Sequence, residues 1–278
     1  MTTNPYRSIS IHYLRWLALL VVSLSPTLFA TTLARADDQR PNVVFIIVDD
    51  LNDLPLAPLG KPAIVTPNID RLAERGVSFT NAHTNDPICA PSRACMMFGL
   101  YPQTTGLYWF ENWRQNKILN ESVSLNRHLK NNGYTVFGTG KVYHIGRGDN
   151  AFDEFGYRTE FGPWPWDGKG GQVFRPHPAM MYMYETDGDM GYKWEHHFGR
   201  LSMIPEWPVN EANGTPGYRG WRLYGKPYRY VNSEDRDPLA DELCADWGTE
   251  IIERAHDKPY ALFVGLTRTH TPLYAPDE

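Results

Sequence analysis

The sequence is poor in cysteine and has no excess of basic charge. Its 278 residues include only three cysteines, too few for a small disulfide-stapled protein or a cysteine-rich zinc module. The formal net charge is −5, whereas a general nucleic-acid binder would show a basic field. These shortages exclude a disulfide scaffold, and we expect no nucleic-acid partner.

The sequence also lacks a long uninterrupted apolar run. The most apolar stretch, 16–30, contains a proline and falls short of the ~20 residues that a membrane-spanning helix needs. It follows Arg7 and Arg15 and precedes a small-x-small sequence at 34–36, which is the layout of a secretory signal peptide. We therefore predict a signal peptide over residues 1–36, a secreted or periplasmic protein and no stable membrane anchor. A retained anchor is the alternative.

The remaining composition is that of a globular protein, with 42% hydrophobic and 21% charged residues. Apolar runs at 42–48 and 260–266 are continuous, as in strands buried on both faces of a parallel sheet. Helical patterns alternate with them, and this order predicts a doubly wound, mostly parallel α/β sheet flanked by helices. Binding sites of such sheets lie beyond the carboxyl ends of the strands.

Between these two runs, periodicity, prolines and glycines predict further elements. In chain order, we expect a helix over 66–76, a strand over 77–82, a helix through 123–133, a strand over 134–139 and a helix over 240–255.

Residues 161–235 interrupt the alternation, because they are rich in Gly, Pro, Trp and Tyr and show little periodicity. We predict an irregular excursion within a single domain that spans 37–278. Its tryptophans either stack on sugar rings or pack the loops onto the domain, and packing is the favoured interpretation. They are Trp164, Trp166, Trp194, Trp207 and Trp221.

Two acids, Asp49 and Asp50, directly follow the first buried strand. Adjacent carboxylates repel each other and lose hydration there unless a cation joins them, and hard oxygen ligands suit Ca²⁺ or Mg²⁺. The alternative is a helix cap beside a solvated acid.

The sequence Cys89-Ala90-Pro91-Ser92-Arg93 predicts a helix that begins near Pro91 and runs to about Phe98. The Cys89 thiol would lie at the positive end of the helix dipole, where an anion is stabilised. Arg93 adds a permanent cation with a planar set of donors. The alternative is a buried structural cysteine. Since three is an odd number, one cysteine has a role outside a disulfide.

These motifs resemble the type I sulfatases. The Cys-x-Pro-Ser-Arg sequence follows a Val-Asp-Asp strand end and the segment TPNIDRLAERGVSFTNAH, and 140–144 matches the Gly-Lys-x-x-His element of the family. The run LYPQTTGLYWFENWR and a Thr-His-Thr-Pro sequence most resemble the iduronate-2-sulfatase branch. The resemblance covers 41 to about 160 and returns at about 237–276. It implies an alkaline-phosphatase-like α/β fold.

The resemblance implies that a formylglycine-generating enzyme oxidises Cys89 to formylglycine, whose hydrated aldehyde attacks the sulfur of a sulfate ester. Cys95 and Cys244 then remain, and we expect two buried free thiols, with a disulfide between them as the alternative. It also implies one divalent cation, Ca²⁺ or Mg²⁺, per chain, held by Asp49, Asp50 and the group derived from Cys89.

Four further residues receive catalytic roles from the same resemblance. Arg93 would orient the diol, and Lys141 would hold the sulfate and the oxygen derived from the aldehyde. His144 would support deprotonation of the second hydroxyl, and His270 would bind the sulfate and assist the leaving oxygen. Thr269 departs from the usual Lys-Pro-His sequence of the related branch.

Family members also carry a later strand that ends in Asp-His or Asp-Asn, and a further lysine. Neither occurs up to Glu278, so we expect an N-terminal portion of a sulfatase domain that is weakly active by itself. The predicted function is a sulfuric-ester hydrolase acting on a sulfated sugar or glycosaminoglycan. The alternatives are a phosphodiesterase or phosphonate hydrolase of the same superfamily, or a non-catalytic carbohydrate-binding remnant.

Overall fold

The computed structural model describes residues 40–51, 65–144, 146, 151–165, 181–182, 197–203 and 221–277. The chain divides into two units, and the unit Asn42–Glu278 holds the elements given below. The predicted signal peptide lies outside the described residues, as do Trp166, Trp194 and Trp207. Within the described ranges, no helix has both the length and the apolar character that a membrane span requires.

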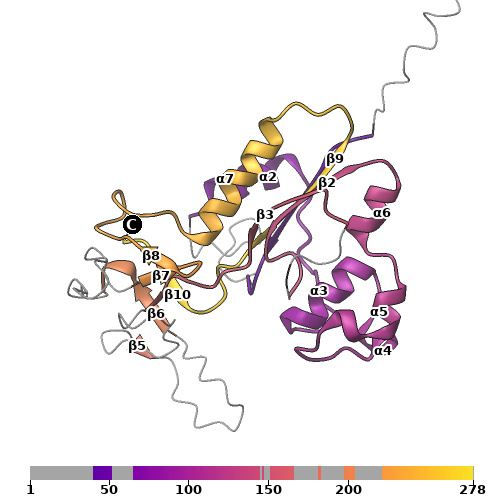
Figure 1. The fold of residues 1–278 in the computed structure, drawn as a ribbon, viewed down its shortest axis with the longest axis horizontal. Coiled ribbons are helices and arrows are strands. Elements are labelled where there is room, and N and C mark those ends of the chain that lie inside the picture. Colours follow the sequence, from indigo (N-terminus) through magenta and orange to yellow (C-terminus); the bar gives the residue numbers. More distant parts are fainter. Residues whose placement is uncertain are drawn as a thin grey trace, which may run out of the picture. The chain divides into compact units, whose positions relative to one another are not determined.

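A four-stranded sheet forms the centre of this unit (Figure 1). All three neighbouring strand pairs are parallel, which confirms the predicted doubly wound architecture. The long central strand pairs on both sides, because Val264 lies opposite Ile46 and Thr139. In spatial order the strands are β1 (Val43–Val48), β9 (Tyr260–Leu266), β2 (Thr135–Gly140) and β3 (Glu154–Arg158).

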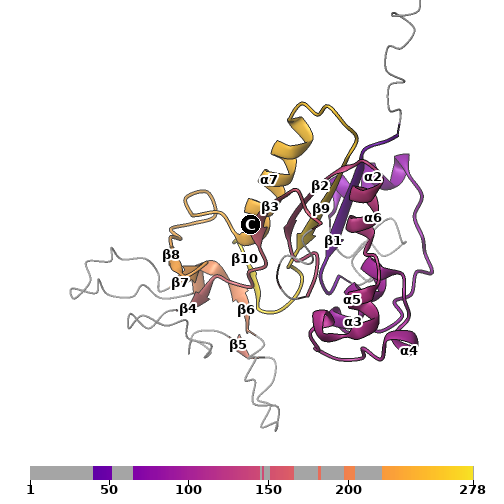
Figure 2. The same ribbon diagram turned by 45° about the vertical axis from the view of Figure 1, so that its right-hand side comes forward.

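The two faces of β9 belong to two different cores. Phe263 packs with Met97 in one cluster, whereas Leu262 and Val264 pack with Ile251 in another. This alternation follows from the two-residue period of a strand. Figure 2 shows the corresponding layers, with α7 on one side of the sheet and α3 and α6 on the other. Burial on both faces explains the continuous apolar run of β9. The same prediction is wrong for β1, because this strand lies at the edge of the sheet and its Val44 and Ile46 are 42% and 60% exposed.

Most predicted elements are present, with small shifts of their ends. The helix expected from the Cys89 motif begins at Cys89 itself and ends before Gly99, whose φ of 67° is a left-handed cap. The helices are α2 (Pro67–Arg75), α3 (Cys89–Phe98), α4 (Pro102–Thr105), α5 (Lys117–Glu121), α6 (Leu125–Asn131) and α7 (Ala240–Glu253), with short 3₁₀ turns at Trp113–Gln115 and Leu201–Met203.

The strand predicted over 77–82 is wrong, because these residues form a turn and irregular backbone and pair with none of the strands that the structure describes. Val77 and Phe79 are 80% and 77% exposed. The apolar alternation therefore reflects no half-buried sheet face. Ile69 and Leu72, apolar residues of α2, are also exposed, by 43% and 68%.

The region 161–235 contributes short strands to two small three-stranded sheets. One sheet has the order β10-β6-β5 and the other β4-β7-β8. Trp164 is 7% exposed and Trp221 is fully buried, so these two tryptophans offer no face to a sugar. Trp221 packs against Tyr274, which lies outside this region, with the ring centres 4.9 Å apart. The strands are β4 (Trp164–Pro165), β5 (Met181–Tyr182), β6 (His197–Arg200), β7 (Trp221–Leu223), β8 (Lys226–Tyr228) and β10 (Leu273–Ala275).

Candidate active site

Charged residues directly follow β1 and β2, the two parallel neighbours of β9, at the same edge of the sheet. Asp49 comes directly after β1 and donates its backbone N–H to Leu266 of β9 at 3.1 Å. Lys141 comes directly after β2 and donates its N–H to Gly265 at 2.8 Å. The candidate site therefore lies at the carboxyl edge of the sheet, where the topology predicts it.

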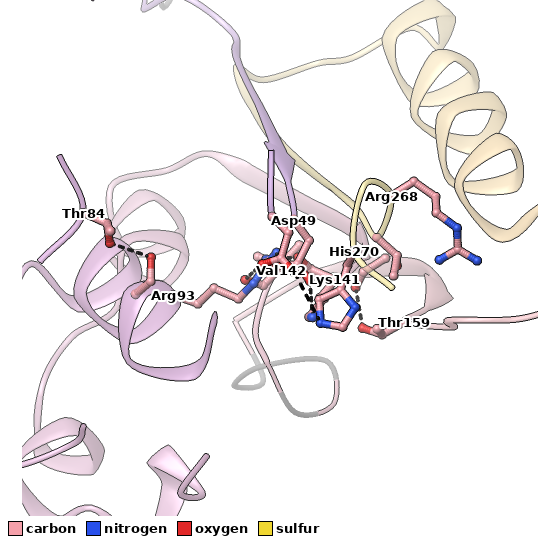
Figure 3. A network of polar contacts seen from close by, with 12 residues as sticks. Asp49, Thr84, Arg93, Lys141, Val142, Thr159, Arg268 and His270 are labelled. Carbon is pink, nitrogen blue, oxygen red and sulfur yellow. Dashed lines mark hydrogen bonds and ion pairs between the residues drawn. The ribbon is translucent and has the colours of Figure 1, made fainter. Parts of the chain in front are cut away.

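The carboxylate of Asp49 lies between two buried cations (Figure 3). It accepts a hydrogen bond at 2.7 Å from the guanidinium of Arg93, which α3 carries, and another from the ammonium of Lys141. All three side chains are at least 95% buried. Burial by itself raises the pKa of Asp49, but the charges of Lys141 and Arg93 outweigh it and hold the pKa below its ordinary value.

Arg93 and Lys141 have further partners that fix their positions. The guanidinium of Arg93 also donates to the backbone oxygens of Lys141 and Val142, which ties α3 to the end of β2. The Lys141 ammonium lies 4.5 Å from the centre of the Phe161 ring, a cation–π distance. Both cations are therefore held rigidly rather than free to sample solvent.

Cys89 is the first residue of α3 and is only partly exposed. Burial, followed by the charges of Asp49 and Asp50, raises the pKa of its thiol despite the opposing charges of Lys141 and Arg93. For the unmodified side chain, burial and the two carboxylates therefore outweigh the groups that favour an anion on Cys89. At neutral pH this cysteine is a thiol and a poor nucleophile. The expectation that Cys95 and Cys244 are free is confirmed, and of the two only Cys244 is buried.

Asp50 and His270 face each other at the open side of the site. Asp50 has a positive φ of 57°, and its carboxylate lies 3.7 Å from Nε2 of His270. The other ring nitrogen of His270 lies 2.6 Å from the backbone oxygen of Thr271. Burial and the nearby charge of Lys141 lower the pKa of His270. Thr269, the residue that departs from the family sequence, donates its N–H to the backbone oxygen of Asp49 at 3.1 Å.

His144 lies in the loop after β2 and belongs to the same electrostatic cluster. Burial, and then the charge of Lys141, lowers its pKa to about 4, so the imidazole is neutral at physiological pH. Its Nδ1 is buried without a hydrogen-bond partner among the described residues. One face of the ring contacts Phe110, with the ring centres 5.1 Å apart. A neutral imidazole with a free nitrogen can accept a proton or a hydrogen bond from a bound group.

The described residues supply only part of a divalent-cation site. Asp49 and Asp50 offer hard carboxylate oxygens, but no group of three or more His, Cys, Asp or Glu side chains suited to a metal occurs in the described ranges. Ca²⁺ takes 6–8 oxygen ligands, so these donors are too few for a complete site. The charges of Asp49 and Asp50 balance those of Arg93 and Lys141, and a bound anion would therefore need a further positive charge nearby.

The structure thus brings the predicted residues into one cluster. The electrostatic partners of Cys89 include Asp49, Asp50, Lys141 and Arg93, and those of His144 include Lys141 and His270. Sequence reasoning missed Asp241, whose carboxylate accepts the backbone N–H groups of Thr267 and Arg268 at 2.8 and 2.7 Å. It thereby holds the loop that leads to His270.

Sequence reasoning also missed Arg268. Its guanidinium points away from Asp49 (Figure 3) and donates to the backbone oxygens of Phe161 and Gly162 at 2.7 and 2.9 Å. This long-range connection positions Phe161, whose ring contacts both Lys141 and His270. The only sign in the local sequence that Arg268 belongs to the site is its position close to His270.

Known proteins are similar to this chain in sequence. The family model described as Sulfatase matches residues 41–278. The chain is 36% identical to human iduronate 2-sulfatase over 95% of this chain and 42% of that protein. It is 32% identical to a sulfatase of Formosa agariphila over 86% of this chain and 41% of that protein. The chain therefore spans about two fifths of the length of these relatives.

Solved structures share the fold. The crystal structure of Ps i-CgsB in complex with k-i-k-neocarrahexaose is 21% identical, with a TM-score of 0.53 over 86% of this chain and 47% of that one. A phosphonate monoester hydrolase of Agrobacterium radiobacter is 19% identical, with a TM-score of 0.50 over 86% of this chain and 43% of that one. The family match over residues 41–278 establishes that the chain belongs to the sulfatase family.

Proposed function

We propose that the protein containing this chain hydrolyses sulfate esters of a sugar or glycosaminoglycan, using a formylglycine derived from Cys89. The observation that carries this proposal is the buried arrangement of Asp49 between Arg93 and Lys141, beside Cys89. Buried cations fixed in advance are what a reaction needs when negative charge develops on its substrate.

Conversion of Cys89 to formylglycine would replace a poorly nucleophilic thiol by a group that suits the reaction. The raised pKa leaves the unmodified side chain protonated at neutral pH, whereas formylglycine supplies a hydrated aldehyde whose hydroxyl is the nucleophile. A formylglycine-generating enzyme is therefore a proposed partner during maturation, and export through residues 1–36 remains part of the proposal.

The chain's own residues would act around the sulfate. Lys141 would contact a sulfate oxygen from the end of β2, and Arg93 would stabilise negative charge at the first turn of α3. His270, which faces the open side near Asp50, would contact the sulfate near the leaving oxygen. His144, neutral and with a free Nδ1, would accept the proton of the second hydroxyl.

A divalent cation, Ca²⁺ or Mg²⁺, would add the positive charge that the cluster lacks. Asp49 and Asp50 are the carboxylates that would contribute to its site, together with residue 89. Such an ion neutralises anionic oxygens and lowers the pKa of a bound hydroxyl.

A sulfated sugar is the proposed substrate class. Iduronate 2-sulfatase and N-acetylgalactosamine-6-sulfatase of the mouse, named for sulfated sugars, are 34% and 27% identical to this chain. A phosphonate or phosphodiester substrate is the second candidate, since a phosphonate monoester hydrolase shares the fold.

Parallel assays with an aryl sulfate and an aryl phosphodiester separate the two candidates. The protein is co-produced with a formylglycine-generating enzyme, and Cys89→Ala is compared with Cys95→Ala, which removes a thiol from the same helix. We expect sulfate-ester turnover that Cys89→Ala abolishes and Cys95→Ala retains. Faster turnover of the phosphodiester would favour the second candidate, and turnover that survives Cys89→Ala would refute both.

A further inference from the structure

Three consecutive aromatic residues are half exposed in the loop between α4 and the turn at Trp113–Gln115. Tyr108, Trp109 and Phe110 are 49%, 47% and 48% exposed. Clustered aromatic surface of this kind is unfavourable in water and marks a place where a ligand or partner is bound. The tryptophans of 161–235 that the structure describes are buried and cannot have this role.

The loop is held in place at both ends. Leu107 and Trp113, which flank it, are 1% and 8% exposed and belong to the core beside α3. Within the loop, the N–H of Glu111 donates to the backbone oxygen of Trp109 at 2.8 Å, which closes a tight turn. The exposed rings are thus presented by a fixed backbone, so little conformational freedom would be lost on binding.

The aromatic loop reaches the candidate active site through a direct ring contact. The Phe110 ring lies 5.1 Å from the His144 imidazole, and Trp109 meets Phe110 edge to face at 5.2 Å. His144 in turn shares electrostatic interactions with Lys141 and His270. The exposed rings of Trp109 and Phe110 therefore extend the candidate active site beyond its buried charged residues.

We propose that Trp109 and Phe110 form a stacking platform for the pyranose ring that carries the sulfate. This inference rests on the proposed function and adds to it a position for the sugar ring. The charged cluster suits the sulfate group, whereas an aromatic face, with its negative quadrupole, suits the C–H-rich face of a sugar ring. The platform would determine specificity for sulfated sugars over the bare anion.

Two ligands distinguish binding of the sugar ring from binding of the sulfate group. Binding of a sulfated pyranose and of inorganic sulfate is measured by calorimetry and by saturation transfer to the C–H protons of the sugar. Trp109→Ala is expected to weaken binding of the sulfated pyranose about tenfold and to leave sulfate binding within about twofold. Trp109→Phe, which retains a ring, should restore most of the affinity. Phe79→Ala is the control, because it removes an exposed ring outside the aromatic loop.

Unchanged affinity for the sulfated pyranose in Trp109→Ala and Phe110→Ala would overturn the proposal, and so would a parent chain that does not bind this sugar. Self-association that Trp109→Ala abolishes, without an effect on the sugar, would assign the patch to a protein contact and also overturn it. Sugar binding that depends on Trp109 in a protein without sulfate-ester turnover would support the platform while the proposed reaction fails.

Discussion

The side chains of Asp49 and Lys141 meet across the end of β9, the strand that separates β1 from β2. The ion pair thereby joins two strands that share no backbone hydrogen bonds. Since both groups are almost completely buried, each depends on the other for the compensation of its charge.

Asp49→Asn should destabilise the domain strongly, because it leaves Lys141 and Arg93 buried without their anion. Removal of one partner of a buried ion pair costs about 3 to 5 kcal/mol, which urea unfolding would measure as a shift of the midpoint at constant slope. Asp50→Asn is the matched control, since Asp50 is exposed and asparagine tolerates its positive φ. Equal stability of the two variants would contradict a structural role for the Asp49 cluster.

His144 should remain neutral far below the ordinary pH range of histidine. Because burial and Lys141 lower its pKa from 6.5 to about 4, the unfolded chain binds a proton between these values and the folded chain does not. The associated stability is complete above pH 6.5 and is lost as the pH falls toward 4. Titration of the imidazole C–H signals by NMR tests this prediction, and a His144 midpoint near 6.5 would refute it.

Asp241→Asn should loosen the loop that carries His270, because an amide has only one oxygen for the N–H groups of Thr267 and Arg268. We expect a loss of about 1 to 3 kcal/mol and faster hydrogen exchange at these two amides. Asp246→Asn, on the exposed side of the same helix, should change neither quantity. Unchanged exchange in Asp241→Asn would mean that other contacts hold the loop.

Gly265→Ala should disrupt the end of the sheet, because a Cβ at this position would overlap the backbone of Lys141. Neither backbone segment can move without breaking the Lys141–Gly265 hydrogen bond of 2.8 Å, so we expect a loss of about 3 kcal/mol or more. Gly225→Ala, in a turn with open space around it, should cost about 1 kcal/mol. Thermal unfolding of both variants gives the comparison, and similar losses would contradict the close approach at Gly265.

Much of the central sheet and of the candidate site could be predicted from local sequence. Strands β1 and β9 are continuous apolar runs, and Asp49 and Cys89 belong to short local motifs. The runs predict the strands themselves but not their burial, because β9 is buried on both faces whereas Val44 and Ile46 of β1 are exposed. The strand predicted over 77–82 failed because alternation along a segment cannot reveal whether a partner strand exists.

The remaining site features depend on contacts between distant segments. Asp241 lies 26 residues from the first amide that it holds, and Phe110 meets His144 only after folding. The raised pKa of Cys89 likewise depends on burial and on the charges around it. A local sequence pattern cannot predict which of these distant residues contact each other, although each segment carries a chemically suitable residue.

Peptide mass spectrometry across residue 89 tests the central claim most directly. The protein is isolated from cells that contain a formylglycine-generating enzyme, and its sulfate-ester turnover is measured on the same sample. The account predicts an aldehyde in place of the thiol in the active material, in proportion to turnover. An intact cysteine at position 89 in a fully active preparation would contradict it.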